Sequence, residues 1–228
     1  MLTVKIDSIT DAIRNELWYS AGNEILQHFL SRGVTVTVFA GGIRDLTLKN
    51  VCGYEQIEPR DWDIGISGIS RIEFDGILRE FGGLKNKYGG FKLFCRDSKP
   101  WEIWRQEDTV GLLKTGAPFS IENILRSFVL SCNAIACDLE KGYIYDCGAL
   151  RSIFKREVTI LDDAIMHDEN TFAAKALNLA FRRQFKLASI SKRFVGTYLD
   201  VDSLVHEFEK TLTPPLPLLI RGNIQRRN

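Results

Sequence analysis

The sequence has almost no excess of charge of either sign. Its 228 residues include 30 lysines and arginines against 29 aspartates and glutamates, which gives a formal net charge of +1 at pH 7. A protein that attracts nucleic acid through a general positive field is therefore not indicated, and a nucleic-acid surface would have to be a local patch. The hydrophobic fraction of 45% and the charged fraction of 26% are typical of a globular protein.

Long apolar runs and targeting signals are also lacking. No apolar stretch is long enough to cross a bilayer, so no membrane partner is expected, and the amino-terminal residues mix acids with apolar residues, unlike a secretory signal. An odd number of cysteines without such a signal predicts reduced thiols in a cytoplasmic protein. They lack the spacing and the histidine neighbours of a zinc site, so we expect buried, inert thiols. The cysteines are Cys52, Cys95, Cys132, Cys137 and Cys147.

Hydrophobic periodicity and turn residues predict a mixed α and β chain. Apolar residues at helical spacing indicate helices, the first of which should break near Gly22, and β-branched or alternating stretches indicate strands. The predicted helices cover residues 9–30, 43–50, 72–81, 121–128, 171–187 and 201–212, and the predicted strands cover residues 34–40, 61–67, 91–95, 101–104, 133–139 and 143–147.

The elements divide into an α+β core over residues 1–160 and a helical segment over residues 161–228. No shift in composition marks a flexible linker, so we expect the helices to pack on the core. Prolines at 214–217 end the regular structure, and a short basic tail follows. In the helix that starts near residue 171, the residues expected on one buried face are Ala174, Leu177, Phe181 and Phe185.

The most informative segment is the alternating strand at residues 61–67, DWDIGIS. One face carries Trp62, Ile64 and Ile66, and the other carries Asp61, Asp63, Gly65 and Ser67. Two carboxylates on one face repel each other unless a cation lies between them. Magnesium prefers oxygen ligands and often takes one or two carboxylates plus substrate phosphates. Glu102, in the strand WEIW, faces outward in the same way and is the candidate for a third carboxylate.

Other features have two interpretations that the sequence leaves open. A short motif of two aspartates is also typical of a solvated strand face. Trp104 either packs in the core or stacks on a base, because it shares the outward side of its strand with Glu102. A local basic patch is either a solvated helix face or a contact for a phosphate backbone, and it consists of Arg182, Arg183, Lys186, Lys192 and Arg193.

A diglycine turn precedes the acidic strand. The strand VTVTVFA runs into Gly41 and Gly42 and then into IRDLTLKN, which is predicted to be a helix. A strand, a glycine turn and a helix in this order commonly present backbone N–H groups to a phosphate.

These blocks together resemble the head domain of class II CCA-adding enzymes and bacterial poly(A) polymerases. The matching blocks are FAGGIRDLTL, PRDWDIGI, NAIACDLEKGYIYDCGAL and AAKALNLAFRRQFKL, in the family's order over residues 34–185. The resemblance implies a polymerase beta-like nucleotidyltransferase fold, with a mixed sheet and flanking helices. It also implies a nucleoside triphosphate substrate and Mg²⁺ or Mn²⁺ as the cofactor.

The resemblance also implies roles for single residues. Asp61, Asp63 and Glu102 would ligate the metal ions and form the catalytic group. The nucleotide would be bound by the backbone of the diglycine turn and by side chains at three further positions. These nucleotide-binding residues are Gly41, Gly42, Arg44, Arg60 and Asn133.

Two departures from the family pattern affect the expected function. Ser127, Phe128 and Val129 stand where the family has Arg-Arg-Asp, and the residues that read the base in CCA-adding enzymes are not matched. We therefore expect a metal-dependent transfer of a nucleoside monophosphate to an acceptor hydroxyl, which belongs to RNA, a protein or a small molecule. The alternative is a nucleotide- or partner-binding module that has this fold and no turnover.

Overall fold

A computed structural model describes residues 1–20, 22–94, 99–161 and 169–212, with side chains up to residue 209. The predicted proline stop, the basic tail and Cys95 lie outside these residues. Among the described cysteines, Cys132 and Cys137 are buried, Cys52 and Cys147 are partly buried, and all four are free thiols. None of the described helices is long and apolar enough to span a membrane.

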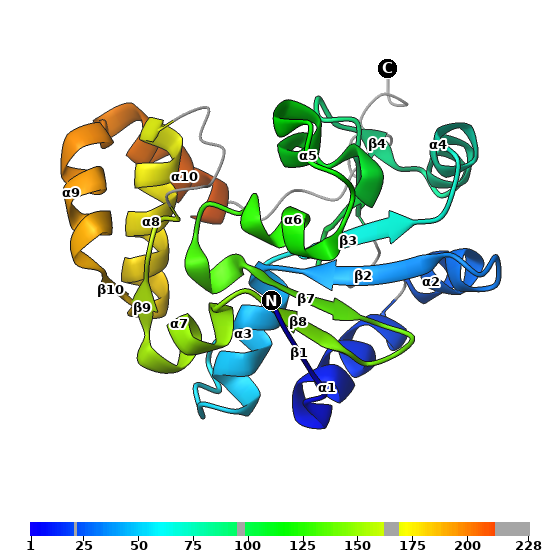
Figure 1. Cartoon of the computed structure of the whole chain (residues 1–228), viewed down its shortest axis with the longest axis horizontal. Coiled ribbons are helices and arrows are strands. Elements are labelled where there is room, and N and C mark those ends of the chain that lie inside the picture. The colour runs from blue at the N-terminus through cyan, green and yellow to red at the C-terminus, as the bar shows by residue number, and fades with distance from the viewer. Residues whose placement is uncertain (21, 95–98, 162–168, 213–228) are drawn as a thin grey trace, which may run out of the picture.

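Within the described residues, eight strands form a mixed sheet in the order β1-β8-β7-β2-β3-β6-β5-β4 (Figure 1). Only β3 and β6 pair in parallel in this sheet, and a separate parallel pair joins β9 to β10. The strands are β1 (Leu2–Val4), β2 (Thr35–Phe39), β3 (Trp62–Ser67), β4 (Leu84–Lys85), β5 (Phe91–Leu93), β6 (Trp101–Arg105), β7 (Ile135–Asp138), β8 (Ile144–Asp146), β9 (Glu157–Val158) and β10 (Lys186–Leu187).

Helices surround this sheet and extend beyond it in a carboxy-terminal group (Figure 1). They are α1 (Asp7–Trp18), α2 (Asn23–Leu30), α3 (Gly41–Asn50), α4 (Arg71–Glu80), α5 (Val110–Thr115), α6 (Ile121–Arg126), α7 (Ala149–Lys155), α8 (Glu169–Arg183), α9 (Ser189–Tyr198) and α10 (Val201–Leu212), with short 3₁₀ turns η1 (Gln106–Asp108) and η2 (Ser131–Asn133). The predicted mixed architecture is confirmed.

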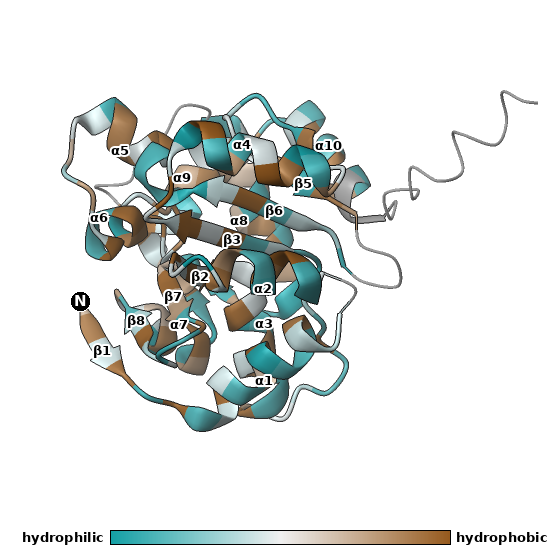
Figure 2. Cartoon of the chain, turned by 90° about the vertical axis from the view of Figure 1, so that its right-hand side faces the viewer, coloured by the Kyte–Doolittle hydropathy of each residue, from teal (hydrophilic) through white to brown (hydrophobic). Residues whose placement is uncertain are grey.

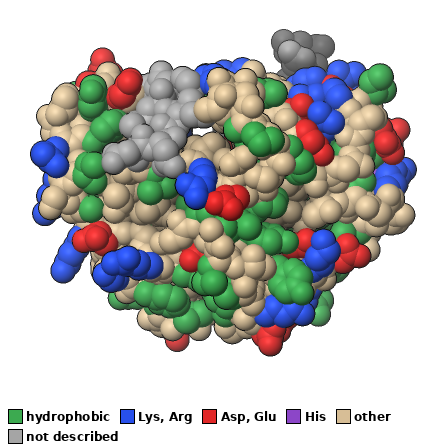
Figure 3. Space-filling view, in the orientation of Figure 1, with side chains coloured by type: hydrophobic (Ala, Val, Ile, Leu, Met, Phe, Trp, Pro, Cys, Tyr) green, Lys and Arg blue, Asp and Glu red, His purple; other side chains and the backbone are tan. Residues whose placement is uncertain are grey.

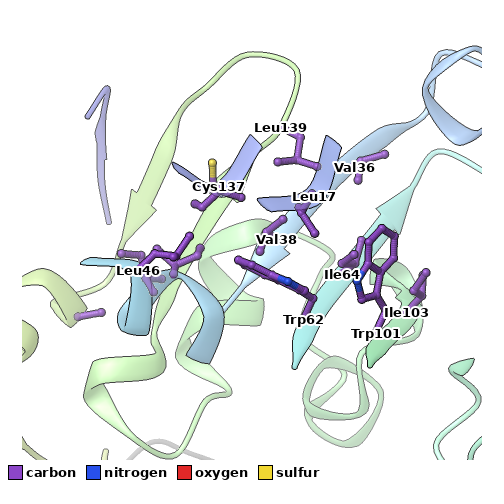
Figure 4. Close-up of a cluster of buried hydrophobic side chains, with 14 of the residues drawn as sticks. Leu17, Val36, Val38, Leu46, Trp62, Ile64, Trp101, Ile103, Cys137 and Leu139 are labelled. Carbon is purple, nitrogen blue, oxygen red and sulfur yellow. The ribbon is translucent and has the colours of Figure 1, made fainter. Parts of the chain in front are cut away.

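The main hydrophobic core lies on one face of the sheet, where α1, α2, α3 and α4 bury their apolar sides. Hydrophobic and hydrophilic residues alternate along these covering helices, as Figure 2 shows for α1 and α4. Trp62 and Trp101 are fully buried in this core beside Val36, Val38 and Ile64 (Figure 4). The alternation read from the sequence at residues 61–67 is therefore confirmed for the apolar face.

A second, smaller cluster lies on the opposite face of the sheet, under α5 and α6. Its centre is Phe39, and the ring of Trp104 packs on it with centroids 5.1 Å apart. The Trp104 indole N–H donates a hydrogen bond to Thr109, 3.1 Å away. This tryptophan thus has packing and hydrogen-bond partners within the protein, which favours the packing interpretation over base stacking.

The carboxy-terminal helices α8, α9 and α10 pack on one another and join the main core through residues such as Ala173, Ala176 and Val195. The alanines allow close approach, and they form the buried side of α8. The prediction that Phe181 lies on this buried face is wrong: its side chain is 74% exposed and lies against the ring of Phe208 in α10, 6.1 Å between centroids. Phe185, past the end of α8, is buried as predicted. The boundary between the core and the helical segment near residue 160 stays a prediction.

Several elements were not predicted from the sequence, namely β1, β4, α5, α7, α9 and the pair β9–β10. Except for α9, which has ten residues, their side-chain patterns are too short to show a period, and partners elsewhere in the chain define them. For example, β1 forms only because its backbone pairs with β8, in a register that joins Thr3 to Tyr145. The predicted break near Gly22 is confirmed, since α1 ends at Trp18 and α2 begins at Asn23.

Gly22 has a packing reason that gives a testable prediction. A Cβ atom at this position would lie 2.2 Å from the ring of Trp101, which is fully buried. We expect Gly22→Ala to lower the free energy of unfolding by about 1–3 kcal/mol through overpacking. Gly76→Ala is the matched control, because nothing lies within 4 Å of its added Cβ in α4. It should be neutral or stabilising by up to about 1 kcal/mol. Denaturant unfolding of both variants measures the difference, and equal midpoints would contradict the packing argument.

Candidate active site

The candidate site begins where β2 runs into α3. Ala40 joins the two elements with φ 58° and ψ −119°, a conformation that residues with a side chain rarely adopt. Its N–H donates to the carbonyl of Ile135 at 2.9 Å, and its carbonyl accepts from the N–H of Arg44 at 3.1 Å. No side chain among the described residues caps the start of α3, so its first N–H groups are available to an anion.

The two glycines of the turn differ in their surroundings. A Cβ at Gly42 would lie 2.5 Å from the ring of Trp62, so close packing of α3 on β3 requires glycine there. A Cβ at Gly41 would meet its nearest neighbour, Nη2 of Arg44, at an ordinary 3.5 Å. Packing therefore explains the glycine at position 42, and the nucleotide-binding role predicted for both glycines stays a prediction.

Arg44 is fixed at this turn by partners on both sides. Its Nε donates to Oδ1 of Asp45 at 2.8 Å, and its Nη1 donates to Oδ1 of Asn133 at 2.6 Å. Burial alone would lower the pKa of the Arg44 guanidinium, but the nearby negative groups, chiefly Asp45, together outweigh burial, so this pKa lies above its usual value. Arg44 thus stays a cation at the start of α3, with Asn133 from η2 holding its outer end.

Asp45 has a second arginine partner that the sequence did not reveal. Nη2 of Arg183, the last residue of α8, lies 2.8 Å from Oδ2 of Asp45, and the same nitrogen lies 3.0 Å from the carbonyl oxygen of Glu58. The side chain of Asp45 is 2% exposed and that of Arg183 is 21% exposed. The interpretation of the basic patch as a solvated helix face is therefore wrong for Arg183. It remains open for the four other residues, all of which are exposed.

The acidic residues come together through the parallel pair of strands. Asp63 of β3 and Glu102 of β6 are directly paired in register, so both side chains leave the same face of the sheet. That face also carries Phe39, which pairs with Asp63 from the other side. Asp61 lies one residue before β3. The structure therefore places Asp63 and Glu102 side by side, as the sequence predicted.

Two of the acids have basic partners. Asp61 accepts hydrogen bonds from Nε and Nη2 of Arg60 at 3.0 and 2.7 Å. An oxygen of Glu102 lies 3.7 Å from the ammonium group of Lys92, across the β5–β6 pair. Lysine, arginine and acidic side chains are likewise interspersed over the described part of the face in Figure 3, which shows no continuous basic surface.

Asp63 is the acid whose proton affinity is most perturbed. Burial, reinforced by the negative charges of Asp61 and Glu102, raises the pKa of the Asp63 carboxyl to about 7. The positive charges of Arg60 and Arg44 oppose this shift without cancelling it. Asp61 and Glu102 therefore repel the ionised Asp63 electrostatically, and a cation among the three acids would relieve this repulsion.

The acids do not form a complete metal site as they stand. Within the described residues, no group of three or more aspartate, glutamate, histidine or cysteine side chains is close enough to hold an ion. The carboxylate of Asp61 is turned to Arg60, although its charge still acts on Asp63. The oxygen donors fit magnesium or manganese in kind, so assignment of Asp61, Asp63 and Glu102 as ligands remains a prediction.

Two of the three residues that depart from the family pattern, Phe128 and Val129, are hydrophobic, and the third, Ser127, is polar. Phe128 packs against Phe39 with centroids 6.2 Å apart, in the small cluster on the acidic face. Val129 is buried in the main core. Phe128 and Val129 thus pack against hydrophobic neighbours, at positions where the family that the sequence resembles has the charged sequence Arg-Arg-Asp.

Comparison with solved structures shows which known proteins have a similar fold. The Thermotoga maritima CCA-adding enzyme complexed with tRNA has a TM-score of 0.62 and 20% identity, and the match covers 99% of this chain and 54% of that chain. A complex of a CCA-adding enzyme with CTP has a TM-score of 0.60 and 22% identity, over 97% of this chain and 53% of the other. A tRNA nucleotidyltransferase complexed with a primer tRNA and an incoming ATP analog has a TM-score of 0.57 and 19% identity, over 82% and 56%.

This chain thus spans about half the length of the structures that it matches. No protein-family model and no curated protein sequence matches it. The TM-scores of 0.57–0.62 establish the fold, and at identities of 19–22% they establish the fold alone. The resemblance read from the sequence is confirmed at that level: the chain has the nucleotidyltransferase fold of the CCA-adding enzymes.

Proposed function

We propose that this chain transfers a nucleoside monophosphate from a nucleoside triphosphate to a hydroxyl group of an RNA acceptor. The acceptor oxygen forms a bond to the α-phosphorus and its proton passes to solvent. The bond from that phosphorus to the oxygen that bridges it to the β-phosphorus breaks, and pyrophosphate leaves. The observation that carries the proposal is the in-register pair of Asp63 and Glu102 beside the uncapped start of α3. The matched structures include complexes with CTP, ATP and tRNA, which favours RNA over a protein acceptor.

The residues of the chain would divide the work between phosphate and metal binding. Arg44 and the first N–H groups of α3 would bind the triphosphate, with Arg44 held in place by Asn133. Asp61, Asp63 and Glu102 are the proposed ligands of Mg²⁺ or Mn²⁺. When bound, such an ion neutralises charge on the phosphates and on the leaving group. Positioning and electrostatics would account for the rate enhancement, so no histidine base is required.

A second candidate function is binding of a nucleotide without turnover. The observation in its favour is that Asp61 and Glu102 already have basic partners, Arg60 and Lys92, and that the described acids form no metal group of three. In that case the acids would be a charge-balanced surface. If the chain catalyses transfer, substitution of Asp63 should abolish the reaction. If the chain only binds nucleotide, the same substitution should leave the affinity unchanged.

The first test is metal-dependent incorporation of each labelled nucleoside triphosphate into RNA. We expect the wild-type chain to label RNA with Mg²⁺ or Mn²⁺, and Asp63→Asn to reduce labelling by at least about 10²-fold, because the variant loses a charge that holds the ion. Glu73→Gln is the control, since it removes an exposed acid of α4 that forms an ion pair with Arg32 and not with a residue of the candidate site. It should label RNA like wild type.

Two results would contradict the proposed transfer reaction. Full activity of Asp63→Asn would rule out the proposed role of the acidic pair. If the wild-type chain labels nothing, and both it and Asp63→Asn bind nucleotide with the same affinity in calorimetry, the binding function is correct.

A separate prediction concerns stability and pH. The pKa of Asp63 is raised from 3.8 to about 7 in the folded chain. The unfolded chain therefore loses this proton at lower pH than the folded one, and the folded state is progressively destabilised as pH rises from about 3.8 to about 7. In a chelator, Asp63→Asn should have the same Tm as wild type near pH 4 and a higher Tm at pH 8, by about 2–4 °C for each kcal/mol of relieved repulsion.

Magnesium gives the complementary measurement at pH 8. Addition of Mg²⁺ should raise the Tm of the wild-type chain, because it binds the folded acids, and should leave the Tm of Asp63→Asn nearly unchanged. An equal response of the two proteins to Mg²⁺ would mean that the ion does not bind at Asp63.

A further inference from the structure

Arg183 occupies a position that a simple surface ion pair does not explain. It is the last residue of α8, and it comes 138 residues after its partner Asp45. One of its nitrogens, Nη2, contacts both the Asp45 carboxylate and the Glu58 carbonyl. A side chain of the helical segment thus bridges two separate pieces of the catalytic core.

The first piece is the phosphate-binding end of α3. Asp45 is almost fully buried, and its two oxygens are used by two different arginines: Oδ1 by Arg44 and Oδ2 by Arg183. Loss of one partner leaves the charge of a buried carboxylate uncompensated, which is destabilising, and the carboxylate then shifts toward other donors. Arg44 donates to that same carboxylate, so the position of the Arg44 guanidinium depends on Arg183 through Asp45.

The second piece is the loop that leads to the acidic strand. Glu58 lies three residues before Asp61, and its carbonyl accepts a hydrogen bond from Arg183 at 3.0 Å. The Glu58 side chain forms ion pairs with Lys49 and Lys99, which lie outside the helical segment. Of these three contacts of Glu58 within the described residues, only the hydrogen bond to its carbonyl reaches the helical segment. Movement of this loop would displace Arg60 and Asp61, which follow it directly.

We propose that Arg183 is a positioning residue that holds the phosphate-binding end of α3 and the loop before Asp61 in one fixed relation, so that the nucleotide site depends on docking of the helical segment. This inference rests on the proposed function of that site. Arg183 itself is placed to act through Asp45 and the Glu58 carbonyl, and direct contact with the nucleotide is not required.

The carbonyl of Arg183 is tied to the core as well. It accepts a hydrogen bond from Nη2 of Arg156, and the Arg156 guanidinium lies 4.0 Å from the ring centroid of Tyr54. Immediately after α8, β10 pairs in parallel with β9. The end of α8 is therefore fastened to the core by backbone contacts that do not involve the Arg183 guanidinium, and removal of that guanidinium should leave the helix docked.

The neighbouring residue supplies a matched control. Arg182 is exposed, and its guanidinium lies 5.8 Å from the ring of Phe208 in α10. Arg182→Ala and Arg183→Ala remove the same charge from the same helix end. A difference between them reports the contacts with Asp45 and Glu58 and not the loss of a basic residue.

The first experiment is hydrogen exchange measured by mass spectrometry on the full chain, which needs no activity. We expect Arg183→Ala to speed exchange in peptides that cover residues 41–47 and 58–63, with Arg182→Ala and wild type alike. Arg183→Lys keeps the charge with a single donor group and should give an intermediate result, and it serves if the alanine variant does not fold. Unchanged exchange in both peptides, or an equal increase across the whole chain including β5 and β6, would overturn the proposal.

The second experiment measures turnover with the RNA labelling assay. Arg183→Ala should raise KM for the nucleoside triphosphate by about tenfold or more, and added guanidinium ion should restore it by filling the vacated position. Arg182→Ala should show neither effect. A wild-type KM in Arg183→Ala, or a loss that guanidinium does not reverse in a folded protein, would contradict the positioning role. If the wild-type chain neither binds nor turns over nucleotide, the proposed function fails, and the exchange data still decide whether Arg183 holds the two segments.

Discussion

The parallel pairing of β3 with β6 is the constraint on which both the core and the candidate site depend. Because side chains alternate along a strand, one register fixes two faces at once. On one face Trp62 lies next to Trp101 and Ile64 next to Ile103, and on the other Asp63 lies next to Glu102. A slip by one residue would bury the acids and expose the tryptophans, so the hydrophobic core selects the register that brings the carboxylates together.

The same arrangement lowers the stability of the folded chain at the candidate site. Burial of Asp63 near two other negative charges disfavours its ionised form, and Arg44 and Arg60 reduce this cost only in part. Concentrated like charges of this kind are typical of sites that bind cations or phosphate with bound metal. The strained backbone at Ala40, which turns the chain from β2 into α3, is a second local cost at the same place.

Contacts far apart in the sequence complete the site. Asn133 holds Arg44 from the segment before β7, and Arg183 holds Asp45 from the end of α8. These contacts link the turn after β2 to two later parts of the chain, and the helical segment shares one hydrophobic core with the sheet. The candidate site is therefore assembled by the whole described chain and not by the diglycine turn and the acidic strand alone.

The sequence by itself determined most of the longer elements and the alternation of β3, because these follow from the periodic burial of apolar side chains. It also determined that Asp63 and Glu102 leave the sheet on one face, since the alternating pattern assigns the apolar residues to the other. It did not determine α9 or the short elements β1, β4, α5, α7 and β9–β10, which exist through pairing or packing with other segments.

The side-chain partners were decided only by the tertiary structure. Arg182 and Arg183 are adjacent arginines at the end of one helix, and nothing in their local sequence tells them apart. Yet the first is exposed, and the second reaches a buried carboxylate on α3. The same is true of Phe181, whose helical spacing predicted burial, because the alanine side of α8 is the one that allows close packing. Periodicity indicates that an element has an apolar and a polar face. Only the neighbours that the element meets in the folded chain decide which face is buried and which charged side chain finds a partner.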